Sequence, residues 1–200
     1  MGSMPRVSQS HRDARRRQVM DAARRCFTRS GFAGTSMQDI FEESGLSAGA
    51  VYGYFASKEH LTTAIIEEVL SEIMAAFDTA FGSSEPPLPE EVLGHLFRAL
   101  SQPDNGRELA RLAIQVWAES LTNPELTASL SAHYRAVQER FGRLTTMHQQ
   151  RGIIDPGVPP QDAARVLTAL GPAFIFQLAL LDGADAESFQ NGLLALLRKA

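Results

Sequence analysis

The stretch GLSAGAVYGYFASKEHL, residues 45–61, decides the fold of this chain. Ser47 and Ser57 stand where a side-chain oxygen caps the first turn of a helix, and Gly45 precedes them as a turn residue. The segment after Ser47 is short, whereas the segment after Ser57 continues for many residues. The stretch therefore predicts a short helix and a long helix that follow a tight turn.

A second short helix is predicted just before this turn. Residues 37–43 follow Ser36, and Asp39 completes a variant of the capping box three positions later. Upstream, residues 18–30 place apolar side chains on one helical face and end at Gly31, a C-cap signal. Two short helices joined by a glycine-containing turn and preceded by a third helix predict a three-helix helix-turn-helix unit.

Helical spacing continues through the rest of the chain, so the predicted fold class is all-α with about nine helices. The helix after Ser57 runs to about Phe81 and is followed by a proline-rich loop. Later helices are predicted at 89–101, 105–121, 124–150, 160–182 and 185–199. We expect a flexible arginine-containing arm at 1–14, a DNA-binding domain at 15–60 and a larger domain at 61–200; residues 1–3 are typical of a vector-derived leader.

Charge is unevenly distributed along the chain. Residues 1–60 hold nine Lys/Arg and six Asp/Glu, whereas the remainder holds ten and seventeen, although the net charge is −4. A basic end on an acidic body predicts that one end meets a polyanion, with a solvated charged helix face as the alternative. The single cysteine and the lack of a secretory signal favour a cytoplasmic protein. The apolar run 166–181 is interrupted by polar residues and predicts a buried helix rather than a membrane span.

The string GFAGTSMQDIFEESGLSAGAVYGYFASKEHL, residues 31–61, resembles the N-terminal signature of TetR-family transcriptional repressors. The resemblance is specific over 15–61, and beyond it rests on size, helix layout and the stretch RGIIDPGVPPQDAARVL at 151–167. It implies a repressor that binds a palindromic operator as a homodimer. It also implies that a small effector releases the repressor, and the supply of aromatic residues favours a hydrophobic or aromatic one.

Candidate DNA-contacting residues surround the predicted turn. Tyrosine hydroxyls and the Lys58 ammonium suit phosphate contacts, and Gln38 can pair with adenine. The family often has polar side chains at positions 48, 50 and 53, where this chain has Ala48, Ala50 and Gly53. We therefore expect few base hydrogen bonds from the recognition helix, and an arm carrying Arg6 and Arg12 to read the minor groove. The full set is Ser36, Gln38, Ser47, Ala48, Gly49, Ala50, Tyr52, Gly53, Tyr54, Lys58, Arg15 and Arg16.

The resemblance assigns effector binding and dimerisation to the larger domain. Aromatic and polar residues give the candidate effector site: Phe97, Gln115, Trp117, Glu119, Tyr134, Phe141, Phe174 and Gln177, with Phe176, His133 and His148 as further candidates. The helix at 160–182 is apolar nearly all round and the last helix has an apolar face, which predicts a dimer interface, with burial wholly inside one subunit as the alternative. The predicted interface residues are Leu167, Leu170, Phe174, Leu178, Leu181, Phe189, Leu193 and Leu197. Gly171-Pro172 is expected to kink the first of these two helices.

Other functions are less consistent with the sequence. A transcriptional activator, or a regulator triggered by a partner protein, shares the same motif and stays an alternative. The five histidines are scattered and no glycine-rich phosphate loop is present, so we expect no catalytic site, no metal and no cofactor. A non-specific DNA-coating protein would be an unusual use of so large an acidic domain.

Overall fold

A computed structural model describes residues 9–81, 86–102 and 106–197, and these residues form nine helices and no strand. The all-α prediction is confirmed. The chain divides into two compact units, Met1–Glu68 and Val69–Ala200. The division falls after Glu68 rather than after the predicted residue 60, because helix α4 (Lys58–Phe81) contributes its first turns, with the buried Leu61 and Ile65, to the first unit.

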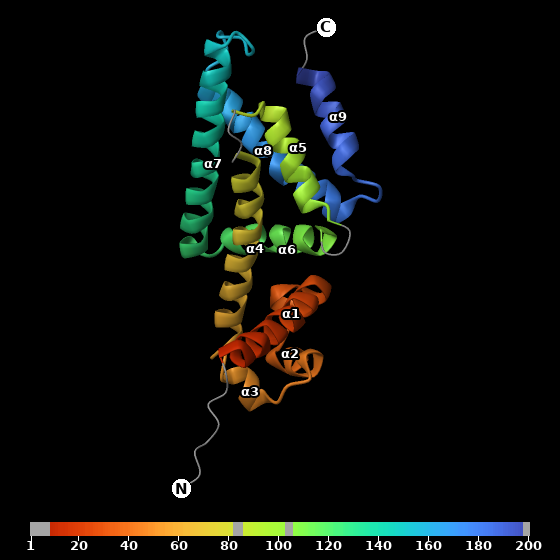
Figure 1. The fold of residues 1–200 in the computed structure, drawn as a ribbon. Coiled ribbons are helices and arrows are strands. Elements are labelled where there is room, and N and C mark those ends of the chain that lie inside the picture. The colour runs from red at the N-terminus through yellow and green to blue at the C-terminus, as the bar shows by residue number, and fades with distance from the viewer. Residues whose placement is uncertain (1–8, 82–85, 103–105, 198–200) are drawn as a thin grey trace. The chain divides into compact units, whose positions relative to one another are not determined.

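The first unit contains α1 (Gln9–Gly34), α2 (Met37–Ser44), α3 (Ala48–Tyr52) and the start of α4 (Figure 1). Its core consists of buried apolar side chains from all four helices and from the segment before α4, among them Val19, Phe27, Ile40, Val51 and Phe55. Burial of these side chains holds the two short helices in place, since helices of this length are marginal alone.

Helix α1 begins earlier than the apolar pattern predicted. It includes residues 9–17, so Arg12 lies in a helix and not in a flexible arm; Arg6 lies outside the described residues. The predicted helix started at residues 15–17, just before the apolar pattern at 18–30, because residues 9–17 carry no apolar periodicity. Arginine, alanine and glutamine are nevertheless good helix formers, and extending an existing helix needs no new nucleus. Near the other end, Gly31 has φ 76° and ψ 168° and interrupts the helix as predicted.

The turn between α2 and α3 has the predicted caps. The Ser36 hydroxyl accepts a hydrogen bond from the Asp39 amide (3.2 Å), and the Asp39 carboxylate accepts one from the Ser36 amide (2.7 Å). Ser47 accepts from the Ala50 amide at the start of α3 (3.3 Å). Gly45 ends α2 with φ 66°, a left-handed conformation that glycine adopts at little cost. Local chemistry therefore fixes both ends of the turn.

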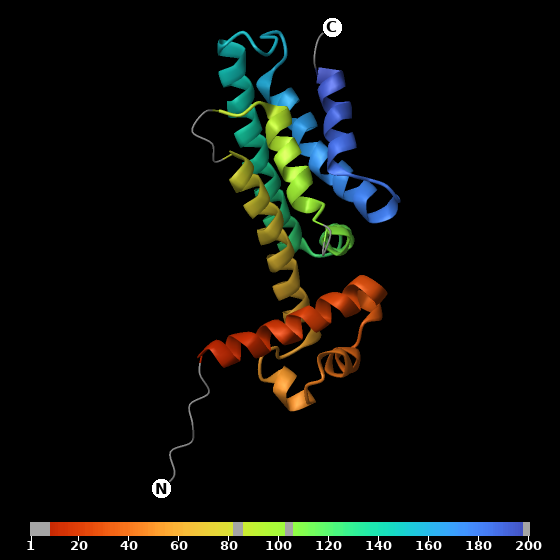
Figure 2. The same cartoon turned by 45° about the vertical axis from the view of Figure 1, so that its right-hand side comes forward.

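The second unit contains the rest of α4 and the helices α5 (Pro89–Leu100), α6 (Gly106–Ser120), α7 (Pro124–Gln150), α8 (Pro160–Leu180) and α9 (Ala186–Leu197) (Figures 1 and 2). Helix α8 packs against α5, α6 and α7, and α9 packs against α5. Helix α8 continues through Pro172 as one element. The predicted helices of this region are thus confirmed.

An aromatic cluster joins α5, α8 and α9. The rings of Phe97 and Phe174 lie 4.7 Å apart, and Phe189 lies 4.8 Å and 5.2 Å from them. Gly94 on α5 lets Gln190 of α9 lie close, because a Cβ atom at Gly94 would fall 2.4 Å from the Gln190 amide. These contacts attach α9 to its own subunit.

Candidate nucleic-acid interface, cavity and self-association face

The recognition helix α3 presents backbone and methyl groups rather than long side chains. Ala48 and Gly49 are exposed, and a Cβ atom at Gly49 would meet no atom within 4 Å. Gly53 ends the helix and is also exposed, while Ala50 is half-buried. This surface carries few side-chain groups that form hydrogen bonds to base edges, and a close approach of α3 to a DNA groove stays a prediction.

Of the polar side chains around α3, Tyr52 is exposed, whereas others form hydrogen bonds within the first unit. Tyr52 is 49% exposed, and its ring packs edge-on against Phe41 at 5.5 Å, which sets its direction. Tyr54 and Lys58 are half-buried, and the Lys58 ammonium donates to the Ala33 carbonyl (3.5 Å) at the end of α1. The Gln38 amide donates to the Glu42 carboxylate (2.8 Å), so base pairing by Gln38 requires this bond to break.

The two candidate arginines of α1 are held by neighbouring side chains. Arg15 donates to the Gln18 side chain (2.8 Å), and Gln18 in turn donates to the Ser44 carbonyl (2.9 Å) at the end of α2. Arg16 is exposed, with its guanidinium carbon 5.3 Å from the centre of the buried Phe55 ring, a cation–π geometry. Both side chains are therefore positioned by the helix-turn-helix unit itself.

Three other arginines of α1 are neutralised within the first unit. Arg25 (2.7 Å) and Arg29 (3.3 Å) pair with Glu43 of α2, and Arg24 pairs with Glu68 of α4 (3.1 Å). The hydrogen bond from Arg25 lowers the pKa of Glu43, so this carboxylate stays charged. The count of basic residues therefore overstates the positive charge that this unit offers to a polyanion.

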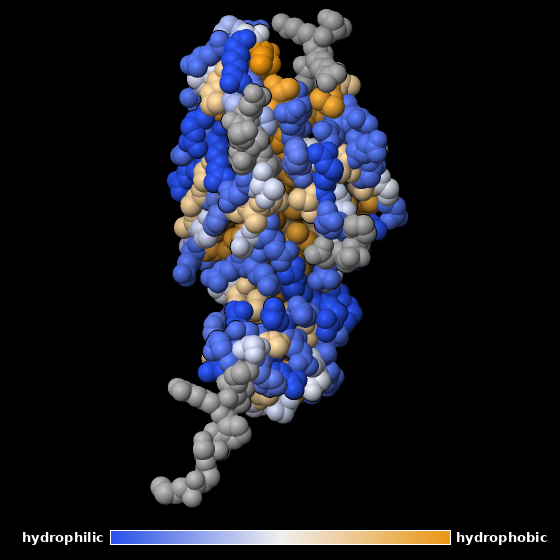
Figure 3. Space-filling view, viewed as in Figure 1, coloured by the Kyte–Doolittle hydropathy of each residue, from blue (hydrophilic) through white to orange (hydrophobic). Residues whose placement is uncertain are grey.

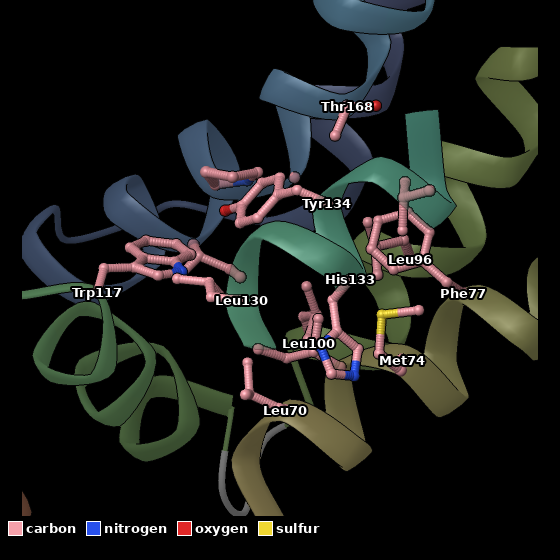
Figure 4. Close-up of a pocket in the computed structure, with 15 residues that line it drawn as sticks. Leu70, Met74, Phe77, Leu96, Leu100, Trp117, Leu130, His133, Tyr134 and Thr168 are labelled. Carbon is pink, nitrogen blue, oxygen red and sulfur yellow. The ribbon is translucent and has the colours of Figure 1, made fainter. Parts of the chain in front are cut away.

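A cavity of about 50 Å³ lies in the second unit (Figure 4). Most of its wall is apolar, and Figure 4 shows side chains from α4, α5, α6, α7 and α8 around it. The lining residues are Leu70, Ile73, Met74, Phe77, Leu96, Leu100, Trp117, Leu130, His133, Tyr134, Val137, Thr168, Gly171, Pro172 and Ile175. Burial raises the pKa of Tyr134 to about 12, which keeps its hydroxyl protonated.

The structure brings two of the eight predicted effector residues to this cavity, Trp117 and Tyr134, together with His133. Phe97 and Phe174 belong to the aromatic cluster, and Phe141 packs edge-on against Phe77 at 6.4 Å. The remaining candidates outside the wall are Gln115, Glu119 and Gln177, with Phe176 and His148. The sequence also favours an effector between the long helix α4 and the C-terminal helices, but no residue of α4 was among the candidates; the cavity wall includes Leu70, Ile73, Met74 and Phe77 of this helix.

Three of the eight predicted dimer residues are part of the subunit's own core. Phe174 is fully buried, and Leu167 and Leu193 are less than a tenth exposed. Leu170, Leu178 and Phe189 are half-buried, Leu181 is exposed, and the side chain of Leu197 lies outside the described residues. Periodicity alone could not separate the face that meets α5, α6 and α7 from a face that meets another subunit.

Helix α8 presents a different apolar face to solvent. Val166, Ala169, Ala173, Phe176 and Leu180 are all exposed and are separated alternately by three and four positions, the spacing of a helix-packing seam. Val166 is 65% exposed, Phe176 54% and Leu180 58%. By length and composition α8 could also cross a membrane, with 39% of its most apolar window buried.

The seam continues into a surface hollow at the start of α8. Leu88, Ile153, Val158 and Val166 contribute apolar side chains to it. Figure 3 shows apolar residues gathered at the end of the second unit where α5 begins and α7 connects to α8, whereas the visible face of the first unit is mostly hydrophilic. Some of the exposed apolar residues of the second unit therefore form a patch at this end.

The α2–turn–α3 geometry defines a helix-turn-helix DNA-binding protein, and comparison with known proteins identifies the family. Residues 19–65 match the family described as bacterial regulatory proteins, tetR family. An uncharacterised helix-turn-helix regulator of Bacillus subtilis, YfiR, is 30% identical over 92% of this chain and 89% of its own length. The chain belongs to the TetR family of transcriptional regulators.

Solved structures support the same assignment. Salmonella enterica GusR is 27% identical, with a TM-score of 0.69 and 96% of each chain covered. SmeT, solved as a complex with triclosan, is 25% identical, with a TM-score of 0.69 over 92% of this chain and 91% of its own. These likenesses extend over both units and agree with a DNA-binding regulator rather than an enzyme.

Proposed function

We propose that this protein is a ligand-responsive repressor that binds a palindromic operator as a homodimer and is released by a small hydrophobic or aromatic effector. The observation that carries the proposal is the exposed, capped α2–α3 pair in a chain whose other unit encloses an apolar cavity. Ser36, Ser47, Tyr52, Tyr54 and Lys58 then hold the DNA backbone. Its cytoplasmic location is part of the same proposal.

Base recognition in this proposal relies on a close approach of α3 to the floor of the DNA groove. Alanine methyl groups of α3 contact thymine methyl groups, and the Gly49 backbone comes near the groove floor. Arg15 and Arg16, together with residues before Gln9, add contacts to phosphates or to the minor groove. The preference for particular operator sequences then depends more on the shape of the DNA grooves than on hydrogen bonds to base edges.

Dimerisation through the α8 seam gives the proposed symmetry. Two recognition helices read half-sites one helical turn apart only when a two-fold axis relates them. The exposed face of α9 carries small residues, Gly192 and Ala195 among them, against which Phe176 and Leu180 of a second copy could pack. Of the dimer residues predicted from sequence, the buried Leu167, Phe174 and Leu193 do not belong to this seam.

Release by an effector requires different affinities for two states of the protein. A ligand in the cavity would contact α4, because Leu70, Ile73, Met74 and Phe77 of the cavity wall belong to this helix. Helix α4 begins in the first unit, so it connects the cavity to the DNA-binding unit along the chain. The relative SmeT, solved as a complex with triclosan, supports an apolar aromatic effector, since triclosan is a compound of that kind. A partner-protein trigger, or activation instead of repression, is the alternative.

The proposal is tested by selecting genomic DNA fragments on the purified protein. We expect a two-fold symmetric site, and Tyr52→Phe should weaken binding about equally on every selected sequence, as loss of a phosphate contact does. Asymmetric or non-selective binding would contradict the proposal. Transcription from the selected site then distinguishes repression from activation.

A further inference from the structure

Two hydrogen-bond donors line the cavity from adjacent helices, the Trp117 indole N–H of α6 and the Tyr134 hydroxyl of α7. Figure 4 shows the Tyr134 hydroxyl directed toward Trp117, while His133 lies on another wall beside Met74 and Leu70. Neither the Tyr134 hydroxyl nor the Trp117 indole N–H has a hydrogen-bond partner among the described residues. The indole donates only, and a phenol with a pKa of about 12 remains protonated. Both groups are therefore suited to one acceptor atom of a ligand.

The wall carries no charged partner for an ionic ligand. Its fifteen residues include no Asp, Glu, Lys or Arg, and Glu119, the one acidic residue among the predicted effector candidates, is not among them. His133 is the only basic side chain, and its Nδ1–H donates to the Ser129 carbonyl (2.8 Å), which leaves Nε2 as an acceptor in the neutral ring. An ion moved into this apolar wall would lose its hydration without a counter-charge.

The cavity must widen to hold a ligand. Its volume of about 50 Å³ is below the ~150 Å³ cavity known to bind benzene. The half-buried lining residues include Met74, Leu130 and His133, whereas Leu96 and Val137 are buried. Methionine adapts its shape easily, so expansion on the side of α4 and α7 is the least costly.

We propose that the cavity selects an uncharged, largely apolar aromatic molecule with one hydrogen-bond-accepting oxygen, which binds the Tyr134 hydroxyl and the Trp117 indole N–H. This inference rests on the proposed effector site and specifies its ligand class. An aromatic cage for a quaternary ammonium ion is the competing use of the same rings. The oxygen ligand is favoured because the two unpaired donors repel a cation and attract an acceptor.

The test uses a matched set of probes on the full chain. Trp117 is the only tryptophan, so its fluorescence reports directly on the cavity. The probes are para-tert-butylacetophenone, tert-butylbenzene without the oxygen, the nearly isosteric para-tert-butylbenzoate, and para-tert-butylphenyltrimethylammonium. Each is titrated against the wild type and Tyr134→Phe, and calorimetry repeats each affinity without fluorescence.

We expect the ketone to bind tightest and the hydrocarbon, which makes neither hydrogen bond, about a hundredfold more weakly, at about tenfold for each neutral hydrogen bond. Tyr134→Phe removes one of the two bonds, so it should weaken the ketone about tenfold and leave the hydrocarbon unchanged, which also shows that the variant folds. Both ions should bind at least about a hundredfold more weakly than the ketone. An ion that equals the ketone, a ketone that equals the hydrocarbon, or no binding by either neutral probe would overturn the inference.

Operator binding, measured separately, tests the proposed function on its own. If the ketone follows the expected pattern but leaves operator affinity unchanged, the ligand class stands and the effector role fails. If the protein binds and releases its operator in response to an ion, the effector role stands and the ligand class fails.

Discussion

Phe176→Ala is expected to weaken self-association strongly, because Phe176 lies at the middle of the exposed α8 seam. A phenylalanine offers roughly 200 Å² of surface, of which 54% is free here, or about 110 Å². At about 25 cal/mol per Å², burying this area in both copies of a dimer contributes about 5 kcal/mol as an upper value. About half of that already raises the dimer dissociation constant by nearly a hundredfold.

Sedimentation equilibrium over a range of protein concentrations measures this constant. Leu121→Ala is the control, because Leu121 is 86% exposed in the turn after α6 and lies away from the seam. Circular dichroism should report unchanged helix content in both variants, since each side chain is exposed. A Phe176→Ala protein that dimerises as tightly as the wild type, or a Leu121→Ala protein that loses its dimer, would refute the assignment of this face.

Three further predictions concern stability. Gly45→Ala should destabilise the protein by about 1–2 kcal/mol in urea unfolding, because φ is 66° there and no atom lies near the added methyl group; Gly49→Ala, with equal space and no positive φ, should not. Glu43→Gln should flatten the loss of stability below pH 4.5, since a carboxyl whose folded pKa is lowered stabilises the fold above its ordinary pKa and loses this contribution as pH falls; an unchanged acid limb would contradict this. Thr168→Val should leave stability unchanged or raise it by about 1 kcal/mol in thermal unfolding, because the buried Thr168 hydroxyl has no partner in the structure, and a clear loss would reveal one.

Local sequence signals placed most of the helices correctly. Ser36 and Ser47 cap α2 and α3, and Gly45 takes the left-handed conformation between them, because these choices depend on a few neighbouring residues. The start of α1 was wrong for a local reason as well. Its first two turns are polar, so the prediction from apolar spacing omitted a segment that helix propensity alone would have included.

Only the tertiary structure shows which apolar helix faces are buried and which helices contact one another. Helix α8 is apolar almost all round, and only its packing against α5, α6 and α7 separates the buried Phe174 from the exposed Phe176. The cavity likewise joins Met74, Trp117 and Tyr134 from three separate helices, a meeting that no single periodicity encodes. The sequence by itself determined the helices, their caps and the family, because those depend on short-range chemistry. The structure decided which apolar faces form the core, the cavity and the free surface, because those depend on contacts between residues far apart in the chain.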